Sequence, residues 1–170
     1  MGPAQRLFIG LLAAVCLVFG IAAGRIAFRP RHPVTQPIAF NHKIHTELLE
    51  CSDCHKYYQE RAHSGLPGLS TCMDCHEEPV TESPEEQKVR DLAAEGKEQV
   101  FKKTFRLPDS VFYTHRRHVT VAGLECSTCH GAIAESEAPP EVPLVRITMN
   151  FCLECHEERG VTTDCVACHR

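Results

Sequence analysis

Residues 126–130 read Cys-Ser-Thr-Cys-His, and this short pattern decides how the rest of the chain folds. Two cysteines are separated by two residues, and a histidine follows the second cysteine at once. The same form occurs five times, at residues 51–55, 72–76, 126–130, 152–156 and 165–169. These stretches contain ten of the eleven cysteines, which indicates one chemistry repeated at five places.

The spacing has a chemical reason. Two thiols three positions apart lie on one side of a helical turn, where each can add to one vinyl group of a haem, and the next residue presents its imidazole to the iron. The pattern therefore predicts five haem c groups. Thioether bonds are expected at Cys51, Cys54, Cys72, Cys75, Cys126, Cys129, Cys152, Cys155, Cys165 and Cys168. The expected proximal ligands of the iron are His55, His76, His130, His156 and His169.

Two other uses of the cysteine pairs stay open on spacing alone. Zinc sites contain such pairs, but they do not need a histidine directly after each one. Disulfide-stapled secreted domains vary their spacings, and cysteines this close seldom form structural bridges. Covalent haem accounts for all five histidines and is the preferred interpretation.

Apolar side chains are scarce outside the N-terminal segment. Leu, Ile, Val and Phe make up 29 of the 139 residues from 32 to 170, about 21%, and the chain has no Trp. Haems would therefore form the interior, and the chain would be largely unfolded without them. We expect a mainly α-helical and coil fold with little regular secondary structure. A net charge of −4 without a basic stripe argues against binding of nucleic acid.

The remaining histidines suggest ligands for the second face of each iron. A second histidine closes the position where small molecules bind and leaves electron transfer as the function. Two His-x-x-His pairs occur in matching contexts before a haem motif, at residues 40–45 and 112–118, which indicates an internal duplication. Histidines three apart lie side by side on a helix, which suits two different haems. The predicted distal ligands are His42, His45, His63, His115 and His118.

Three further residues are possible ligands that we assign otherwise. His32 is expected at the surface, because it lies among arginines and a proline just beyond the apolar segment. Met73 and Met149 lie near haem motifs, but packing in the core is the more common use of methionine.

The chain divides into four parts. Residues 1–31 form an N-terminal membrane anchor, or an uncleaved signal, because the 18 uncharged residues from Leu7 to Gly24 would span about 27 Å as a helix. Residues 38–79 form a two-haem module and residues 112–170 a three-haem module. Residues 80–111 form a charged helical connector, which starts with Ser83 as cap, Pro84 in the first turn and Glu86 closing a capping box. Residues 136–143 should be an extended loop.

The charges beside the apolar segment conflict with the haem chemistry. Arginines follow the segment, and the positive-inside rule alone would place the body of the chain in the cytoplasm. Haem is attached to these motifs outside the bacterial cytoplasmic membrane. We therefore expect a single-pass protein of that membrane whose haem domain faces the periplasm.

The His-x-x-His pairs and haem motifs make the chain resemble the class III multihaem cytochromes c. The second module, with His115-Arg116-Arg117-His118 and residues 148–156, is also similar to the membrane-anchored multihaem subunit of alternative complex III and to the related subunit of periplasmic quinone reductase complexes. The resemblance implies two partners, a periplasmic subunit like molybdopterin and iron–sulfur oxidoreductases and a polytopic quinol-binding membrane subunit. Other redox proteins would exchange electrons with the chain.

The expected function is electron transfer through five haems within a respiratory quinol or quinone oxidoreductase complex, without catalysis by this chain. Two alternatives stay open. One is a stand-alone anchored quinol dehydrogenase that feeds periplasmic reductases. The other is a small-molecule reductase in which one haem iron keeps an open position.

Overall fold

The structure, a computed structural model, describes residues 2–27 and 33–169. The chain forms two compact units, Met1–Pro33 and Val34–Arg170. The first contains one helix, α1 (Pro3–Ala27), whose large apolar side chains between Phe8 and Ile21 are exposed. Among the residues whose side chains are described, no helix has the length and apolar character needed to cross a membrane. The anchor stays a prediction, and His32 lies outside the described residues.

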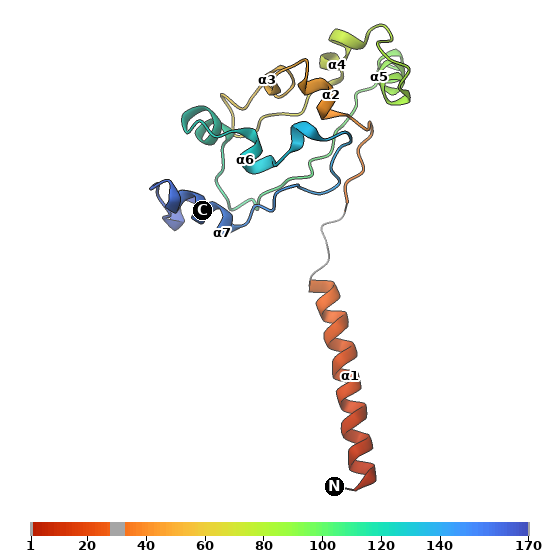
Figure 1. The fold of residues 1–170 in the computed structure, drawn as a ribbon, viewed down its shortest axis with the longest axis vertical. Coiled ribbons are helices and arrows are strands. Elements are labelled where there is room, and N and C mark those ends of the chain that lie inside the picture. The colour runs from red at the N-terminus through yellow and green to blue at the C-terminus, as the bar shows by residue number, and fades with distance from the viewer. Residues whose placement is uncertain (1, 28–32, 170) are drawn as a thin grey trace. The chain divides into compact units, whose positions relative to one another are not determined.

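The second unit consists of short helices joined by long irregular segments (Figure 1). Its helices are α2 (His42–Thr46), α3 (Cys51–Cys54), α4 (Leu69–His76), α5 (Pro84–Ala94), the π-helix η1 (Arg116–Val121), α6 (Cys126–His130), the 3-10 helix η2 (Ile133–Glu135), α7 (Met149–Glu158) and α8 (Cys165–Cys168). Between residues 33 and 169 there is no strand, only an isolated bridge between Val111 and His169. The predicted helix-and-coil fold is confirmed.

Side chains form only a small core in this unit. The buried apolar residues of the described chain are Ile38, Leu69 and Val89, each about 5–6% exposed. Five partly buried residues pack against them, namely Cys72, Met73, Leu92, Ala93 and Phe101. No described side chain is fully buried. The small core agrees with the low apolar content of the sequence, and it lies where α4 packs against α5.

The helix of the charged connector begins as its sequence predicts. The Ser83 side chain caps α5 by accepting a hydrogen bond from the Glu85 backbone N–H, and Pro84 stands in the first turn. The helix ends at Ala94, and Gly96 adopts a φ of +63°, where a side chain would strain the backbone.

One detail of this helix start was predicted wrongly. Glu86 does not close a capping box, because the Ser83 backbone N–H donates to the hydroxyl of Thr81 instead. The Glu86 carboxylate accepts hydrogen bonds instead from the backbone N–H groups of Val80 and Thr81, which lie just before the cap. The other local prediction in this part of the chain, a loop without helix at residues 136–143, is confirmed.

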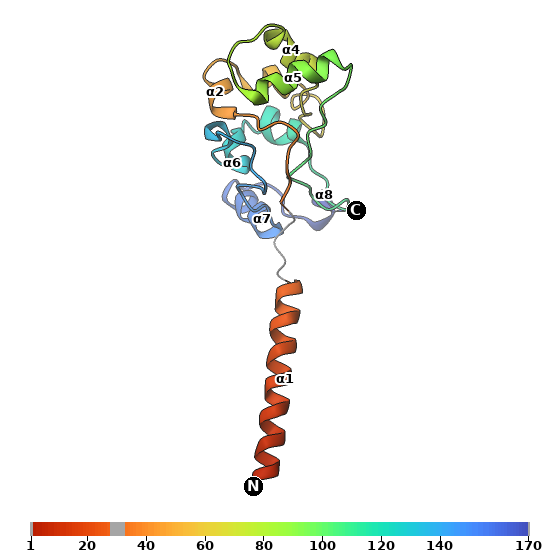
Figure 2. The ribbon, with the colours of Figure 1, turned by 90° about the vertical axis from the view of Figure 1, so that its right-hand side faces the viewer.

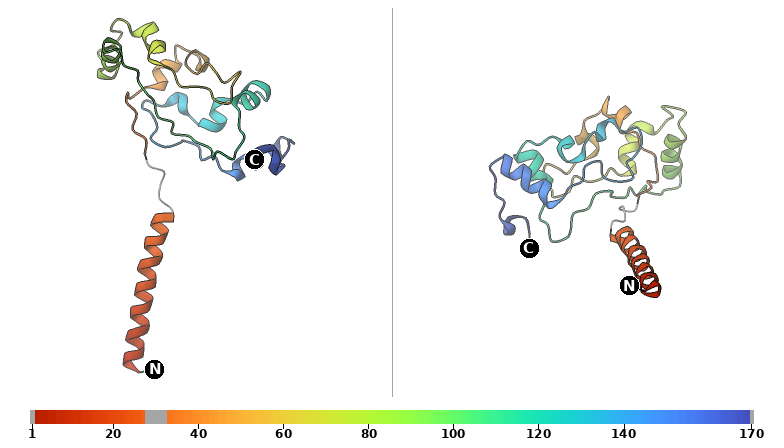
Figure 3. Two further views of the ribbon diagram at one scale, coloured as in Figure 1. Left: turned by 180° about the vertical axis from the view of Figure 1, so that it is seen from behind. Right: turned by 60° about the horizontal axis from the view of Figure 1, so that its bottom comes forward.

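The helices of the second unit are spread from one end of the unit to the other. Figure 2 shows α4 and α5 at one end, α6 in the middle, and α7 and α8 at the opposite end. Both views of Figure 3 show the same order. The helices that carry the five cysteine pairs are therefore distributed along the whole unit, and the predicted module boundaries stay a prediction.

Candidate haem-binding sites

All five cysteine pairs lie on helical turns. α3 and α8 consist of the pair alone, α6 ends on its histidine, and α4 and α7 contain a complete motif. A helical turn places residues three apart on one face, as addition of both thiols to one haem requires. The structure contains no disulfide among the eleven cysteines. Among the described residues, no group of three or more His, Cys, Asp or Glu side chains is arranged to hold a metal ion.

Three predicted distal histidines face three predicted proximal histidines. The ring centres are 6.1 Å apart for His45 and His76, 6.3 Å for His115 and His130, and 6.2 Å for His118 and His156. The rings of His115 and His130 are nearly parallel, at 4°.

These separations suit one metal ion between two imidazoles. An imidazole nitrogen binds a first-row transition metal at about 2 Å, so two rings on opposite sides of one ion have centres about 6 Å apart. Direct ring stacking would bring the centres closer. The residues of the chain therefore fit a haem iron with two histidine ligands at each of the three pairs.

Another predicted proximal histidine, His55, has His42 as a neighbour. Burial and then the nearby His55 lower the pKa of His42 to about 4. His42 and His45 thus lie near different haem motifs, as do His115 and His118. That each His-x-x-His pair serves two haems stays a prediction.

The remaining candidates, His63 and His169, flank the segment 111–115. The backbone N–H of His115 donates to Ala62, the residue before His63. The backbone N–H of Phe112 donates to Cys168, the residue before His169. The side chain of His63 is exposed.

Backbone carbonyls orient five of the ten candidate ligands. An imidazole that binds metal through one nitrogen is usually oriented by a hydrogen bond from the other. Nδ1 lies 2.7–2.9 Å from a carbonyl oxygen in five histidines. These contacts are His45 to Asn41, His55 to Gly65, His115 to Ala62, His118 to Thr114 and His156 to Thr162. The bonds leave Nε2 as the nitrogen free for iron.

The two His-x-x-His segments share two local hydrogen bonds. Asn41 and Thr114 hold equivalent places, because the carbonyl of each accepts from the second histidine of its pair. The side-chain oxygen of each also accepts a hydrogen bond from the backbone N–H three residues later, at 3.2 Å. The second copy continues into the π-helix η1, a form that is frequent at functional sites. The internal duplication predicted from the sequence therefore extends to the hydrogen bonds.

Sequence reasoning missed an aromatic residue in each copy. Phe40 stacks on His45 with ring centres 4.3 Å apart, and Tyr113 stacks on His118 at 4.5 Å. Each ring also contacts the first histidine of its pair edge-on. Burial is the main cause that raises the pKa of Tyr113 to about 12, so its hydroxyl stays neutral. The signal was present in the sequence as an aromatic residue two positions before each pair.

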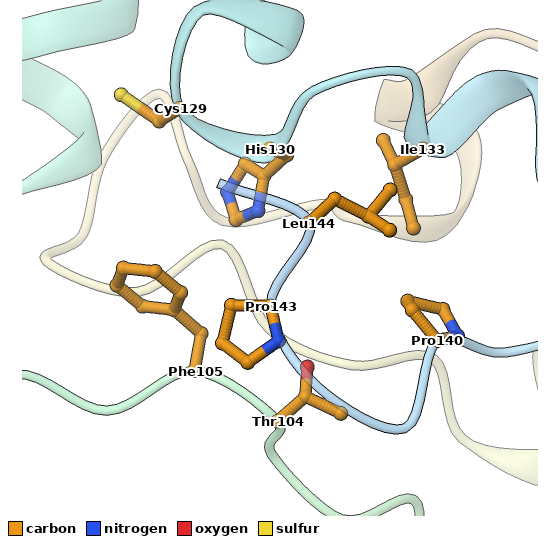
Figure 4. A pocket seen from close by; sticks show the side chains of 8 residues that line it. All are labelled: Thr104, Phe105, Cys129, His130, Ile133, Pro140, Pro143 and Leu144. Carbon is orange, nitrogen blue, oxygen red and sulfur yellow. The ribbon is translucent and has the colours of Figure 1, made fainter. Parts of the chain in front are cut away.

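A hollow lies beside the third motif, at His130. Figure 4 shows the lining side chains around it: Thr104, Phe105, Cys129, His130, Ile133, Pro140, Pro143 and Leu144. Phe105 approaches the His130 ring edge-on, with ring centres 6.0 Å apart. Most of this lining is apolar and next to a motif cysteine and histidine, as expected where a porphyrin edge would pack.

Thiols of different motifs lie close together. Burial is the main cause that raises the pKa of five motif thiols, and a cysteine of another motif adds to each shift. The neighbours are Cys75 for Cys54, Cys54 for Cys72, Cys51 for Cys126, Cys155 for Cys129, and Cys168 for Cys152. These electrostatic neighbours link the motifs in the order 72–76, 51–55, 126–130, 152–156 and 165–169.

The two methionines differ from each other. Met73 packs against the small core, as predicted. Met149 is 58% exposed at the start of α7, and the prediction that it packs in the core was wrong. Its position as the first residue of the helix, directly after the Thr148 cap, leaves its side chain at the surface.

Two family profiles match the chain. The class III cytochrome c family matches residues 25–99, and cytochrome c7 and related cytochromes c match residues 111–170. Together with the relative described next, they show that the chain belongs to the class III, cytochrome c7-type multihaem cytochromes c. It is accordingly an electron-transfer protein with covalently bound haem.

Among curated proteins, the chain is similar to the multiheme cytochrome c subunit of menaquinone reductase from Nitratidesulfovibrio vulgaris, strain Hildenborough. The two are 30% identical over 197 aligned positions, which cover 99% of this chain and 91% of the relative. The similarity thus includes both haem-bearing parts of the sequence and the segment before them.

Proposed function

We propose that this chain is a pentahaem, membrane-anchored electron-transfer subunit of a respiratory quinone oxidoreductase complex. The observation that carries the proposal is the set of three imidazole pairs with ring centres 6.1–6.3 Å apart, each joining a cysteine-pair helix to a histidine from elsewhere in the chain. Bound haem would supply an iron that takes up and gives away single electrons. Two histidines on each iron would leave no position for a substrate, so the chain itself would catalyse no reaction.

The remaining ligand pairs follow from neighbourhood and elimination. His42 is proposed as the distal ligand opposite His55, because His55 lies close enough to lower the pKa of His42. His63 is proposed opposite His169, because the segment 111–115 bonds to the residue before each of them. With the three facing pairs, this assigns all ten predicted axial histidines.

The positions of the cysteines favour a relay. Each of the five motifs has a thiol that is an electrostatic neighbour of a thiol in another motif, and these neighbours link the motifs from α4 to α8. Such a series would carry electrons between the two ends of the unit. One end would then face the electron donor and the other the acceptor.

Membrane attachment and partners are part of the proposal. The exposed apolar side chains of α1 between Phe8 and Ile21 support its role as a single-pass anchor of the bacterial cytoplasmic membrane, with the haem unit in the periplasm. The relative is named as a subunit of menaquinone reductase, which supports a place beside other subunits of such a complex. A molybdopterin or iron–sulfur-like periplasmic subunit and a quinol-binding membrane subunit are the proposed partners.

The test is purification of the full chain from its native membrane in mild detergent. The mass of the mature polypeptide should correspond to five added haems, and the visible and electron paramagnetic resonance spectra should show only low-spin haem. Other subunits should co-purify with the chain. Menaquinol should reduce the haems only when these subunits are present. An active quinol oxidase consisting of this chain alone, or a high-spin haem in the native protein, would contradict the proposal.

A further inference from the structure

The candidate ligand His76 has a neighbour at Nδ1 of a different kind from those of five other candidate ligands. In five histidines Nδ1 lies beside a neutral backbone carbonyl. Nδ1 of His76 has no hydrogen-bond partner and lies 3.4 Å from Oε1 of Glu86. This ring is thus the one for which the structure shows a carboxylate, rather than a carbonyl, near its outer nitrogen.

The carboxylate of Glu86 is held firmly in this place. Its side chain is only 6% exposed, although α5 is otherwise a charged helix. Oε1 accepts hydrogen bonds from the backbone N–H of Val80 and from the guanidinium of Arg90. Oε2 accepts from the backbone N–H and the hydroxyl of Thr81. These donors, the Thr81 hydroxyl first, hold the pKa of the Glu86 carboxyl well below its usual range.

The arrangement costs the helix a favourable contact. A glutamate three residues after a serine cap commonly bonds back to the backbone N–H of the cap. Here that N–H donates to Thr81, and Glu86 faces His76 instead. The side chain therefore bonds to Thr81 and Arg90 rather than to the helix cap, and it lies behind a residue of α4.

We propose that Glu86 is a positioning residue, which acts through His76 to lower the reduction potential of the haem bound at Cys72 and Cys75. The inference rests on the proposed function, since it assumes that His76 binds iron. A carboxylate behind a metal-binding histidine fixes the ring and makes the ligand more basic. Both this basicity and the nearby negative charge favour the oxidised, more positive iron over the reduced one. The carbonyls behind His45, His55, His115, His118 and His156 have no net charge and exert a weaker effect.

The test compares the midpoint potentials of the five haems in the full chain and in two variants, Glu86→Gln and Glu85→Gln. Glu86→Gln keeps the shape of the side chain and removes its charge. Glu85→Gln is the matched control, because Glu85 is the adjacent residue of the same helix and bonds to Ala39 rather than to a histidine. We expect Glu86→Gln to shift one haem to a more positive potential and to leave four unchanged, whereas Glu85→Gln shifts none.

Other results would overturn the inference. These are unchanged potentials in Glu86→Gln, an equal shift of all five haems, or the same shift in Glu85→Gln. If Glu86→Gln does not mature with its haems, Arg90→Gln replaces it. That variant removes the positive partner of the carboxylate, and the same haem should shift to a more negative potential; no shift, or a positive one, would contradict the proposal.

The two proposals fail in distinguishable ways. A chain that carries five low-spin haems but shows no change in Glu86→Gln would overturn the role of Glu86 and leave the electron-transfer proposal intact. A mature chain without haem would overturn both.

Discussion

Each candidate histidine must present one nitrogen to iron while a second contact fixes the orientation of its ring. For five of the histidines the backbone supplies the second contact, through carbonyls of nearby residues such as Asn41 and Thr114. Phe40 and Tyr113 then pack on the faces of two of the rings. A bond to the backbone does not depend on a particular side chain, so the sequence does not reveal it. The aromatic residues do leave a trace in the sequence, as a repeated position.

His63 offers the sharpest test at this scale, because it is the exposed member of the distal set. Replacing His63 with Ala should remove the distal ligand of one haem and leave the other four intact. Electron paramagnetic resonance of the oxidised protein should then show about one haem in five as high-spin. His32→Ala is the matched control and should keep every haem low-spin. An entirely low-spin His63→Ala protein would show that His63 is not a ligand.

Residue patterns predicted the proximal half of each site more completely than the distal half. A covalent motif ties His55 or His76 to its cysteines by position in the sequence, so spacing alone identifies it. A distal histidine reaches its haem only through the fold, and His45 lies 31 residues before His76. Pairing of ligands therefore needed the structure. The role of Glu86 was hidden for a further reason, since its sequence context matches a capping box.

At the scale of elements, α5 is the helix whose importance the sequence understated. Its charged composition suggested a spacer between two modules. In the structure it packs on α4 through Val89 and Leu92, bonds to the segment before His42 through Glu85, and places Glu86 behind His76. The composition of such a helix mainly reflects its exposed residues. The contacts that the helix makes depend on a few residues of its packed face.

Packing of α5 can be tested with two identical substitutions. Val89 is 6% exposed in the small core, and Val100, just beyond the helix, is 73% exposed. Val89→Ala should lower the free energy of unfolding by about 2 kcal/mol, from lost burial and the cavity left behind. Val100→Ala should change it by less than about 0.5 kcal/mol. Denaturant unfolding followed by circular dichroism measures both, and equal effects would show that α5 does not contribute to the core.

Glu85 connects α5 to the first His-x-x-His segment and gives stability a pH dependence. The backbone N–H of Ala39 and then Lys88 lower the pKa of this carboxyl from its ordinary value of 4.5. A lowered pKa means that the ionised group stabilises the folded state above pH 4.5, and that this contribution disappears as the pH falls through the folded-state pKa. Glu85→Ala should therefore cost about 1 kcal/mol at pH 7 and progressively less below pH 4.5.

Glu82→Ala serves as the control for that experiment, because it removes the same charge from an exposed position just before the helix. Its unfolding free energy should follow that of the unchanged chain across the pH range. If the penalty of Glu85→Ala stayed constant down to pH 3, the contact with Ala39 would not depend on the ionised carboxylate.

At the scale of the whole molecule, the haems must replace the core that the side chains do not provide. The described part of the unit Val34–Arg170 has three buried apolar residues, and ordering each residue of a chain costs roughly 1–2 kcal/mol of backbone entropy. Burial of so few side chains, at about 1.5–3 kcal/mol each, cannot offset that cost. We expect that the full chain made without haem attachment will be largely unfolded, with a far-ultraviolet circular dichroism spectrum lacking most of the helical signal of the unit and with rapid proteolysis throughout residues 34–170. The same chain carrying its haems should resist the protease and unfold cooperatively. A haem-free chain that is protected and unfolds cooperatively would show that the polypeptide builds its own interior, and that the haems are additions to the fold rather than its centre.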